Sequence, residues 1–328
     1  MDRRTLALFA ISSLLFGGTF VAAKAGLEYV PPLLFVALRF DVAAVVVLGY
    51  VLATTARAEL VPKTSGDVAA VFATGVLVIG LTNAFLFVGQ QYATSAVAAI
   101  VFSLNPVLTP AFAAVILADE RLSIRGATGI ALGLVGVALV VGPDSTALLG
   151  GDAIGTLVLF AGATSAALGV VAIRRVETTL SSTVRLAWGL PLAAALSHAL
   201  SLSAGESIAS VTWTAEAVIA IGYLALFAGA IAYVAYFALL EAAGAIRTNL
   251  VFYVVPVVSA LGGWALLGEA IEPLALVGFA FVFVGFAVLE SDSIGKLSPH
   301  SGVESAFRRS TEHDRPRADE EPRGYRAD

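Results

Sequence analysis

Apolar positions dominate the chain in ten long runs, separated by short breaks rich in Gly, Pro, Asp and Ser. A helix rises about 1.5 Å per residue, so about 20 apolar residues cross the ~30 Å hydrocarbon core of a bilayer. The pattern therefore predicts an all-α polytopic membrane protein with ten transmembrane helices. The runs lie near residues 5–24, 33–54, 67–89, 94–117, 124–141, 152–173, 183–202, 215–238, 244–267 and 273–290.

Composition supports the same class of protein. Of the 328 residues, 59% are hydrophobic and 13% are charged, whereas charged residues make up about 25% of a typical soluble domain. So little polar surface indicates a chain embedded in lipid. The sequence contains no cysteine, which excludes disulfides and thiol chemistry.

The two ends of the chain differ from its middle. Residues 292–328 are charged, contain Pro and have few large apolar side chains, so we expect a disordered cytoplasmic tail. The first 25 residues combine a basic start, an apolar run and a small-residue "AKA", which also fits a cleavable signal peptide. Because cleavage would leave nine helices and spoil the repeat described next, we expect this segment to be retained.

The sequence repeats itself. A shift of 150 residues aligns Pro106 with Pro256, and a shift of 149 aligns Glu120 with Glu269. We therefore expect two five-helix copies, residues 1–142 and residues 143–291. Since five is odd, the second copy enters the membrane from the opposite side. Inverted repeats are typical of alternating-access transporters, with a central substrate site near the bilayer midplane between the copies.

Basic residues predict the orientation of these helices. With a cytoplasmic N-terminus, every inward connection carries Lys or Arg, and the outward connections carry none. We therefore expect a multi-pass protein of the plasma membrane with both termini in the cytoplasm. The inward residues, apart from the tail, are Arg3, Arg4, Arg57, Lys63, Arg121, Arg125, Arg174, Arg175, Arg185 and Arg247.

Three stretches carry a family resemblance: "LFGGTFVAAKAGLEYVPPLLFVALRFD", "NPVLTPAFAAVILADERL" and "VPVVSALGGWALLGEAIEP". Together with the duplication, they resemble the drug/metabolite transporter superfamily, specifically its EamA-type ten-helix transporters, over about residues 5–290. The resemblance implies an inverted-repeat fold around a central cavity and transport of small metabolites or drugs, often outward. The second copy departs from the pattern, because "FAGATSAALGVVAIRRV" lacks the Gly-Gly-Thr-Phe turn and nothing clearly mirrors Arg39.

Ionisable side chains are rare within the apolar runs and are candidate transport residues, because a charge at the bilayer centre costs ~2.5–3.5 kcal/mol even on lenient scales. They are Lys24, Arg39, Asp41 and His198, of which His198 is expected at the membrane interface. In one interpretation Asp41 pairs with Lys24 and Arg39 extends toward the interface, as structural contacts. In the other, the cations attract an anionic group such as a substrate carboxylate, or Asp41 accepts a coupling proton.

Uncharged polar side chains on the repeat-related helices are further candidates for a substrate cavity. A binding pocket usually combines apolar walls with a few placed polar groups, and we expect Asn83, Asn105, Tyr233 and Tyr253 to face such a cavity. Gln90 is expected at the membrane interface, where amphipathic side chains are common.

The repeated prolines interrupt apolar runs. Pro106 and Pro256 would each free a backbone carbonyl and bend the helix around a shared cavity, unless they lie harmlessly in a first helical turn. Glu120 and Glu269 precede helix starts, so a structural role at the positive end of the following helix is expected.

The predicted function is alternating-access secondary transport, with export of a small metabolite or drug-like solute. Import, or flipping of a lipid intermediate by the same fold, remains open. A membrane enzyme is disfavoured because the sequence contains no Cys, H-E-x-x-H or G-x-S-x-G; a structural or sensory membrane protein is a further alternative. The expected partners are a small-molecule substrate, the lipid bilayer and a coupling proton or cation, without cofactor, metal or nucleic acid.

Overall fold

A computed structural model describes residues 3–117, 123–141, 151–243, 248 and 250–296. The chain is helical throughout this part, without any strand. In the first copy the helices are α1 (Arg3–Gly26), α2 (Pro32–Thr54), α3 (Arg57–Leu60), α4 (Ser65–Phe72), the π-helix η1 (Ala73–Leu81), α5 (Thr82–Gln90), α6 (Ser95–Phe102), α7 (Asn105–Ile116) and α8 (Ile124–Val141).

The second copy follows the same order. Its helices are α9 (Gly151–Arg175), α10 (Ser182–Ser203), the short 3₁₀-helix η3 (Ile208–Ser210), α11 (Ala215–Gly222), the π-helix η4 (Tyr223–Ile231), α12 (Ala232–Ala243), α14 (Val251–Leu267) and α15 (Pro273–Lys296). Among the described residues, seven helices are long and apolar enough to cross a membrane, and three apolar segments are shorter. The predicted all-α polytopic membrane fold is confirmed.

Two details differ from the pattern read along the sequence. The run expected as one helix near residues 94–117 is broken between α6 and α7. Helix α15 continues to Lys296, so it extends into the segment expected as a tail, because backbone hydrogen bonds carry a helix beyond its last apolar residue. Residues 297–328 lie outside the described part of the chain, as does Glu120.

The third helix of each copy contains a π-helical segment at the same place. Segment η1 covers Ala73–Leu81 and η4 covers Tyr223–Ile231, so the two match at the 150-residue shift seen in the sequence. π-helical segments are rare and occur frequently at functional sites. Asn83 and Tyr233 occupy equivalent positions directly beyond these two segments.

Hydrogen bonds to two carboxylates, Asp67 and Glu206, show which helix ends lie close together. The Asp67 carboxylate, at the start of α4, accepts hydrogen bonds from Thr178 and Thr179, which connect α9 to α10. The Glu206 carboxylate, between α10 and α11, accepts from the amides of Leu33 and Leu34 at the start of α2. Because α10 runs between these two levels, α4 and its repeat equivalent α11 start at opposite ends of the molecule. We call these the Asp67 end and the Glu206 end.

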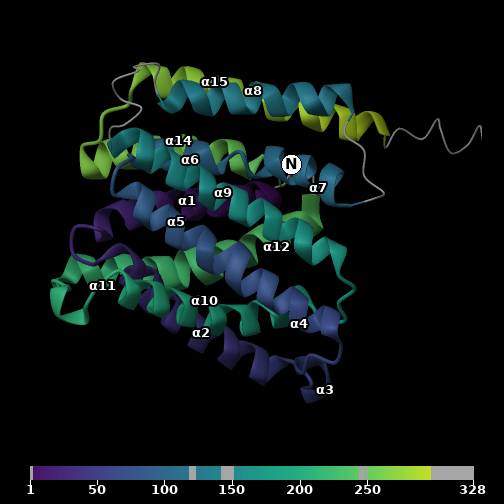
Figure 1. Ribbon diagram of the computed structural model, residues 1–328, viewed down its shortest axis with the longest axis vertical. Coiled ribbons are helices and arrows are strands. Elements are labelled where there is room, and N and C mark those ends of the chain that lie inside the picture. Colours follow the sequence, from purple (N-terminus) through teal and green to yellow (C-terminus); the bar gives the residue numbers. More distant parts are fainter. Residues whose placement is uncertain (1–2, 118–122, 142–150, 244–247, 249, 297–328) are drawn as a thin grey trace, which may run out of the picture.

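The equivalent helices α8 and α15 lie side by side along one edge of the molecule (Figure 1). They approach closely through glycines: a Cβ on Gly136 would lie 2.5 Å from the Gly278 carbonyl oxygen, and one on Gly285 would lie 2.5 Å from that of Gly129. Gly129 and Gly136 correspond to Gly278 and Gly285 at the 149-residue shift. This contact therefore joins equivalent positions of the two copies, as small residues allow in membrane helices.

Candidate functional site

Arg39 is a cation buried inside the helical bundle. It is 7% exposed, and its Nη2 donates to Oδ1 of Asn83 on α5. Its guanidinium carbon lies 4.5 Å from the ring centre of Phe40 and 5.0 Å from that of Phe87. Within the described part of the chain its Nε has no hydrogen-bond partner.

Asn83 is held in a fixed orientation toward Arg39. Its Nδ2 donates to the Ile79 carbonyl at 2.7 Å, one turn earlier and inside η1, so its Oδ1 is turned to the guanidinium. The neighbouring Thr82 hydroxyl donates to the Leu77 carbonyl five residues back, as the wider π-helical turn permits. The bond to the Ile79 carbonyl thus fixes where the amide points.

Tyr233 approaches the same cation from the second copy. It lies within electrostatic range of Arg39, it is 45% exposed, and its ring meets that of Phe16 edge-on with centres 5.1 Å apart. Tyr236, one turn further on α12, contacts the same ring at 5.9 Å. Arg39, Asn83 and Tyr233, three of the residues expected at a substrate cavity, thus gather between the two copies, and we call them the Arg39 cluster.

Lys24 and Asp41 do not form the pair considered from the sequence. The Lys24 ammonium donates to the Gln90 carbonyl at 2.7 Å, where the C-terminal end of α5 favours a cation. Asp41 instead lies 2.9 Å from Nε2 of His198 on α10, and the two side chains are 47% and 42% exposed. Arg39 does not extend toward the interface either, because Asn83 and two aromatic faces receive it inside the bundle.

Asn105 and Tyr253 lie elsewhere. Asn105 begins α7 just after the break in the fourth span, and its buried Oδ1 has no partner among the described residues. Tyr253 packs against two rings of α15, with centres 4.6 Å from Phe283 and 4.7 Å from Phe286.

The two repeated prolines occupy different helical settings. Pro106 lies in the first turn of α7, where no intrahelical bond is lost, whereas Pro256 lies inside α14. They line separate cavities, one with Tyr253 beside Pro106 and a larger one beside Pro256. Two prolines bending their helices around one shared cavity is therefore not the observed arrangement.

A second polar network at the Glu206 end includes residues given other roles from the sequence. Gln90 is fully buried and its Nε2 donates to the Phe20 carbonyl at 2.9 Å, so its side chain lies inside the bundle at the end of its span. The Glu269 carboxylate accepts from the amide of Ser95, with both oxygens at 3.0 Å, and Ser259 donates to the Ser95 carbonyl at 2.8 Å. Glu269 therefore caps α6 of the other copy rather than α15, a contact between distant segments that no local pattern signals.

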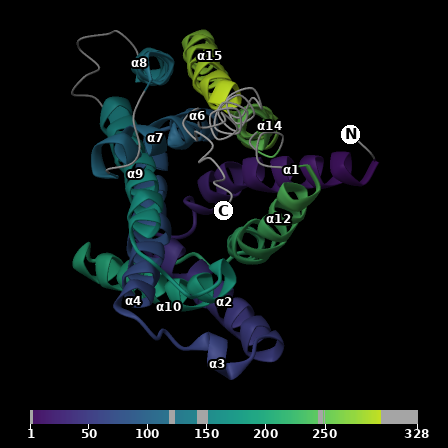
Figure 2. The same cartoon turned by 90° about the vertical axis from the view of Figure 1, so that its right-hand side faces the viewer.

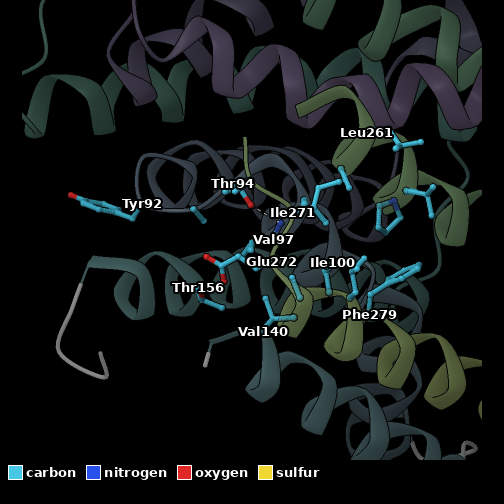
Figure 3. A pocket seen from close by; sticks show the side chains of 18 residues that line it. Tyr92, Thr94, Val97, Ile100, Val140, Thr156, Leu261, Ile271, Glu272 and Phe279 are labelled. Atoms are coloured by element: carbon cyan, nitrogen blue, oxygen red, sulfur yellow. Dashed lines mark hydrogen bonds between the residues drawn. The ribbon is translucent and has the colours of Figure 1, made fainter. Parts of the chain in front are cut away.

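The larger cavity, about 260 Å³, lies at the Glu206 end between α6, α14 and α15 (Figure 3). Thr94, Thr156 and Glu272 lie toward one end of it, and Ile100 and Phe279 toward the other. Glu272 is exposed and the other lining groups are uncharged. Because a buried cation lies in the Arg39 cluster, we take that cluster as the candidate functional site.

The long apolar helices define a multi-pass membrane protein. Its equivalent helices α4 and α11 start at opposite ends, an arrangement typical of inverted-repeat folds. The sequence profile of the EamA-like transporter family matches residues 3–142 and 153–290. The chain belongs to this family, which confirms the resemblance in its sequence.

Individual proteins similar to this chain are also named as transporters. The chain is 26% identical over 289 residues to an uncharacterized transporter of Archaeoglobus fulgidus, covering 86% of this chain and 97% of that protein. It is 28% identical over 305 residues to the uncharacterized transporter YyaM of Bacillus subtilis, covering 90% and 95%. These relatives indicate a transporter rather than an enzyme.

A solved crystal structure is also similar, with a TM-score of 0.58 at 23% sequence identity over 88% of this chain and 98% of that one. At this identity the similarity supports the fold alone.

Proposed function

We propose that the protein is a secondary transporter that exports a small metabolite or drug-like solute across the plasma membrane by alternating access. The observation that carries this proposal is the position of the Arg39 cluster, where one copy supplies Arg39 and Asn83 and the other supplies Tyr233. Residues 1–142 and 143–291 act as the two copies that move relative to one another.

Contacts at both ends suggest how access alternates. At the Glu206 end, Glu206 and Glu269 each link an acidic connection of the second copy to a helix start of the first. At the Asp67 end, Asp67 holds the connection between α9 and α10. In this proposal the two sets of links open in turn, exposing the Arg39 cluster first to one side and then to the other.

The orientation is part of the same proposal. Lys and Arg lie in the inward connections and in the tail, so both termini are in the cytoplasm. This places the Asp67 end at the cytoplasmic face and the Glu206 end outside.

Comparing metabolites inside and outside cells that carry or lack the protein tests the function. Export predicts a solute that accumulates in the medium and is depleted in the carrying cells. The reverse distribution identifies an importer, and an altered lipid distribution between the two leaflets identifies a flippase. No difference in solutes or lipids would contradict transport.

A further inference from the structure

The Arg39 guanidinium has no counter-ion in the described part of the chain. Asp41, two positions further on the same helix, is bonded to His198 instead. Arg39 contacts an amide oxygen and two phenyl rings, and Tyr233 lies within electrostatic range of it. The cation is therefore held in place without being neutralised.

Such an arrangement is costly without a further partner. A buried charged donor lacking a hydrogen bond costs several times what an exposed one does, and the Nε of Arg39 is in this situation. The rings of Phe40 and Phe87 attract the cation and fix its plane, but they accept no proper hydrogen bond from Nε. The buried, unpartnered Nε edge of the guanidinium is the position where an acceptor would be stabilised.

We propose that the transported solute carries a carboxylate that binds to Arg39; this rests on the transport function proposed above. The planar guanidinium matches a carboxylate through two parallel N–H···O bonds. Tyr233 supplies a hydroxyl from the other copy, and the rings of Phe16 and Tyr236 offer apolar surface to the rest of the solute. The site therefore selects an organic acid with an apolar body.

The repeat does not duplicate the Arg39 guanidinium. The position equivalent to Arg39 in the second copy is Gly189, by the 150-residue shift. A Cβ there would lie 3.1 Å from the Thr74 side chain and 3.2 Å from the Gly75 backbone nitrogen. A larger side chain at Gly189 would require these neighbours to shift, and the position carries no cation to match Arg39.

Binding of benzoate and of its neutral isostere benzamide to the purified full-length protein tests the proposal, measured by titration calorimetry. Benzoate is expected to bind at least ~10-fold more tightly than benzamide, a difference of ~1.4 kcal/mol. Arg39→Gln should abolish this preference, and Arg39→Lys should reduce it because the charge remains but the fork is lost. Lys63→Gln, which removes an exposed cation, should keep it.

The proposal is overturned if benzoate does not bind or if both compounds bind equally. It is also overturned if the Arg39→Gln protein is folded and monodisperse and still prefers benzoate. If Arg39→Gln does not fold, an unreduced preference in Arg39→Lys overturns it instead. The identity of exported solutes separates this proposal from the transport function. Export of solutes lacking a carboxylate overturns the anion site but leaves a transporter. Arg39-dependent benzoate binding without any export supports the site and contradicts transport.

Discussion

At the scale of single residues, the four ionisable candidates of the apolar runs, Lys24, Arg39, Asp41 and His198, each contact a partner. Lys24 bonds to a backbone carbonyl, Arg39 to Asn83 and Asp41 to His198. The Lys24–Asp41 pair considered from the sequence does not form, because Lys24 bonds to a carbonyl at the end of α5 instead. Composition and spacing do not show which helix end lies beside a given side chain. Arg39 is the cation proposed to bind the solute.

Double-mutant cycles on unfolding in detergent check these pairings. Asp41→Asn and His198→Ala should show a coupling of about 0.5 kcal/mol or more, since the two side chains contact each other. Lys24→Ala and Asp41→Asn should be additive within ~0.5 kcal/mol because they share no partner. A coupling larger for Lys24 and Asp41 than for Asp41 and His198 would contradict the pairing.

The Asp41–His198 pair is also a candidate for coupling transport to a proton gradient, because a proton that binds to the pair changes its charge. If protons drive transport through this pair, Asp41→Asn should abolish transport driven by a pH gradient in vesicles while passive exchange of the solute continues. Unchanged gradient-driven transport by well-expressed Asp41→Asn protein would show that the pair is structural.

At the scale of elements, the cap that Glu269 places on α6 joins the two copies. Glu269→Ala removes an acceptor shared by the amide and hydroxyl of Ser95, so a loss of ~1–2 kcal/mol in unfolding free energy is expected. Glu272→Ala, a neighbouring exposed carboxylate, is the matched control and should change stability by less than ~0.5 kcal/mol. Equal losses in thermal unfolding would show that Glu269 is not a specific cap.

The π segment η1 packs closely against α10. A Cβ on Gly75 would lie 2.7 Å from the Gly189 carbonyl oxygen, whereas one on Gly49 meets nothing within 4 Å. Gly75→Leu should therefore destabilise by ~1–3 kcal/mol or more through overpacking, and Gly49→Leu should be tolerated. Similar melting temperatures for both variants would contradict this packing.

The sequence predicted the helices better than their interruptions. Apolar runs and the 150-residue shift anticipated the spans and the two copies, because both follow from bilayer thickness and duplication. The π segments were not anticipated, since "ATGVLVIGL" and "YLALFAGAI" have no local feature that separates π- from α-helical hydrogen bonding. The sequence also identified Arg39, Asn83 and Tyr233 as candidates. It did not predict that these three lie together or that Tyr253 packs elsewhere.

At the scale of the whole molecule, two similar halves differ where the solute is proposed to bind. Asn83 in the first copy is equivalent to Tyr233 in the second copy, and Arg39 is equivalent to Gly189, by the 150-residue shift. Views at right angles show α1 and α12 near one another and the α8–α15 pair at the edge (Figure 2). In the proposed mechanism the two similar copies change their relative position, and the side chains that differ between them, Arg39, Asn83 and Tyr233, bind the solute.

Thiol accessibility tests alternating access at the Arg39 cluster most directly. The natural chain contains no cysteine, so Tyr233→Cys provides a single target, and Ser12→Cys, at a position with 0% exposure, serves as a packed control. In right-side-out and inside-out vesicles, a membrane-impermeant thiol reagent should label Tyr233→Cys from either side and leave Ser12→Cys unmodified. Labelling of Tyr233→Cys from one side only would contradict alternating access.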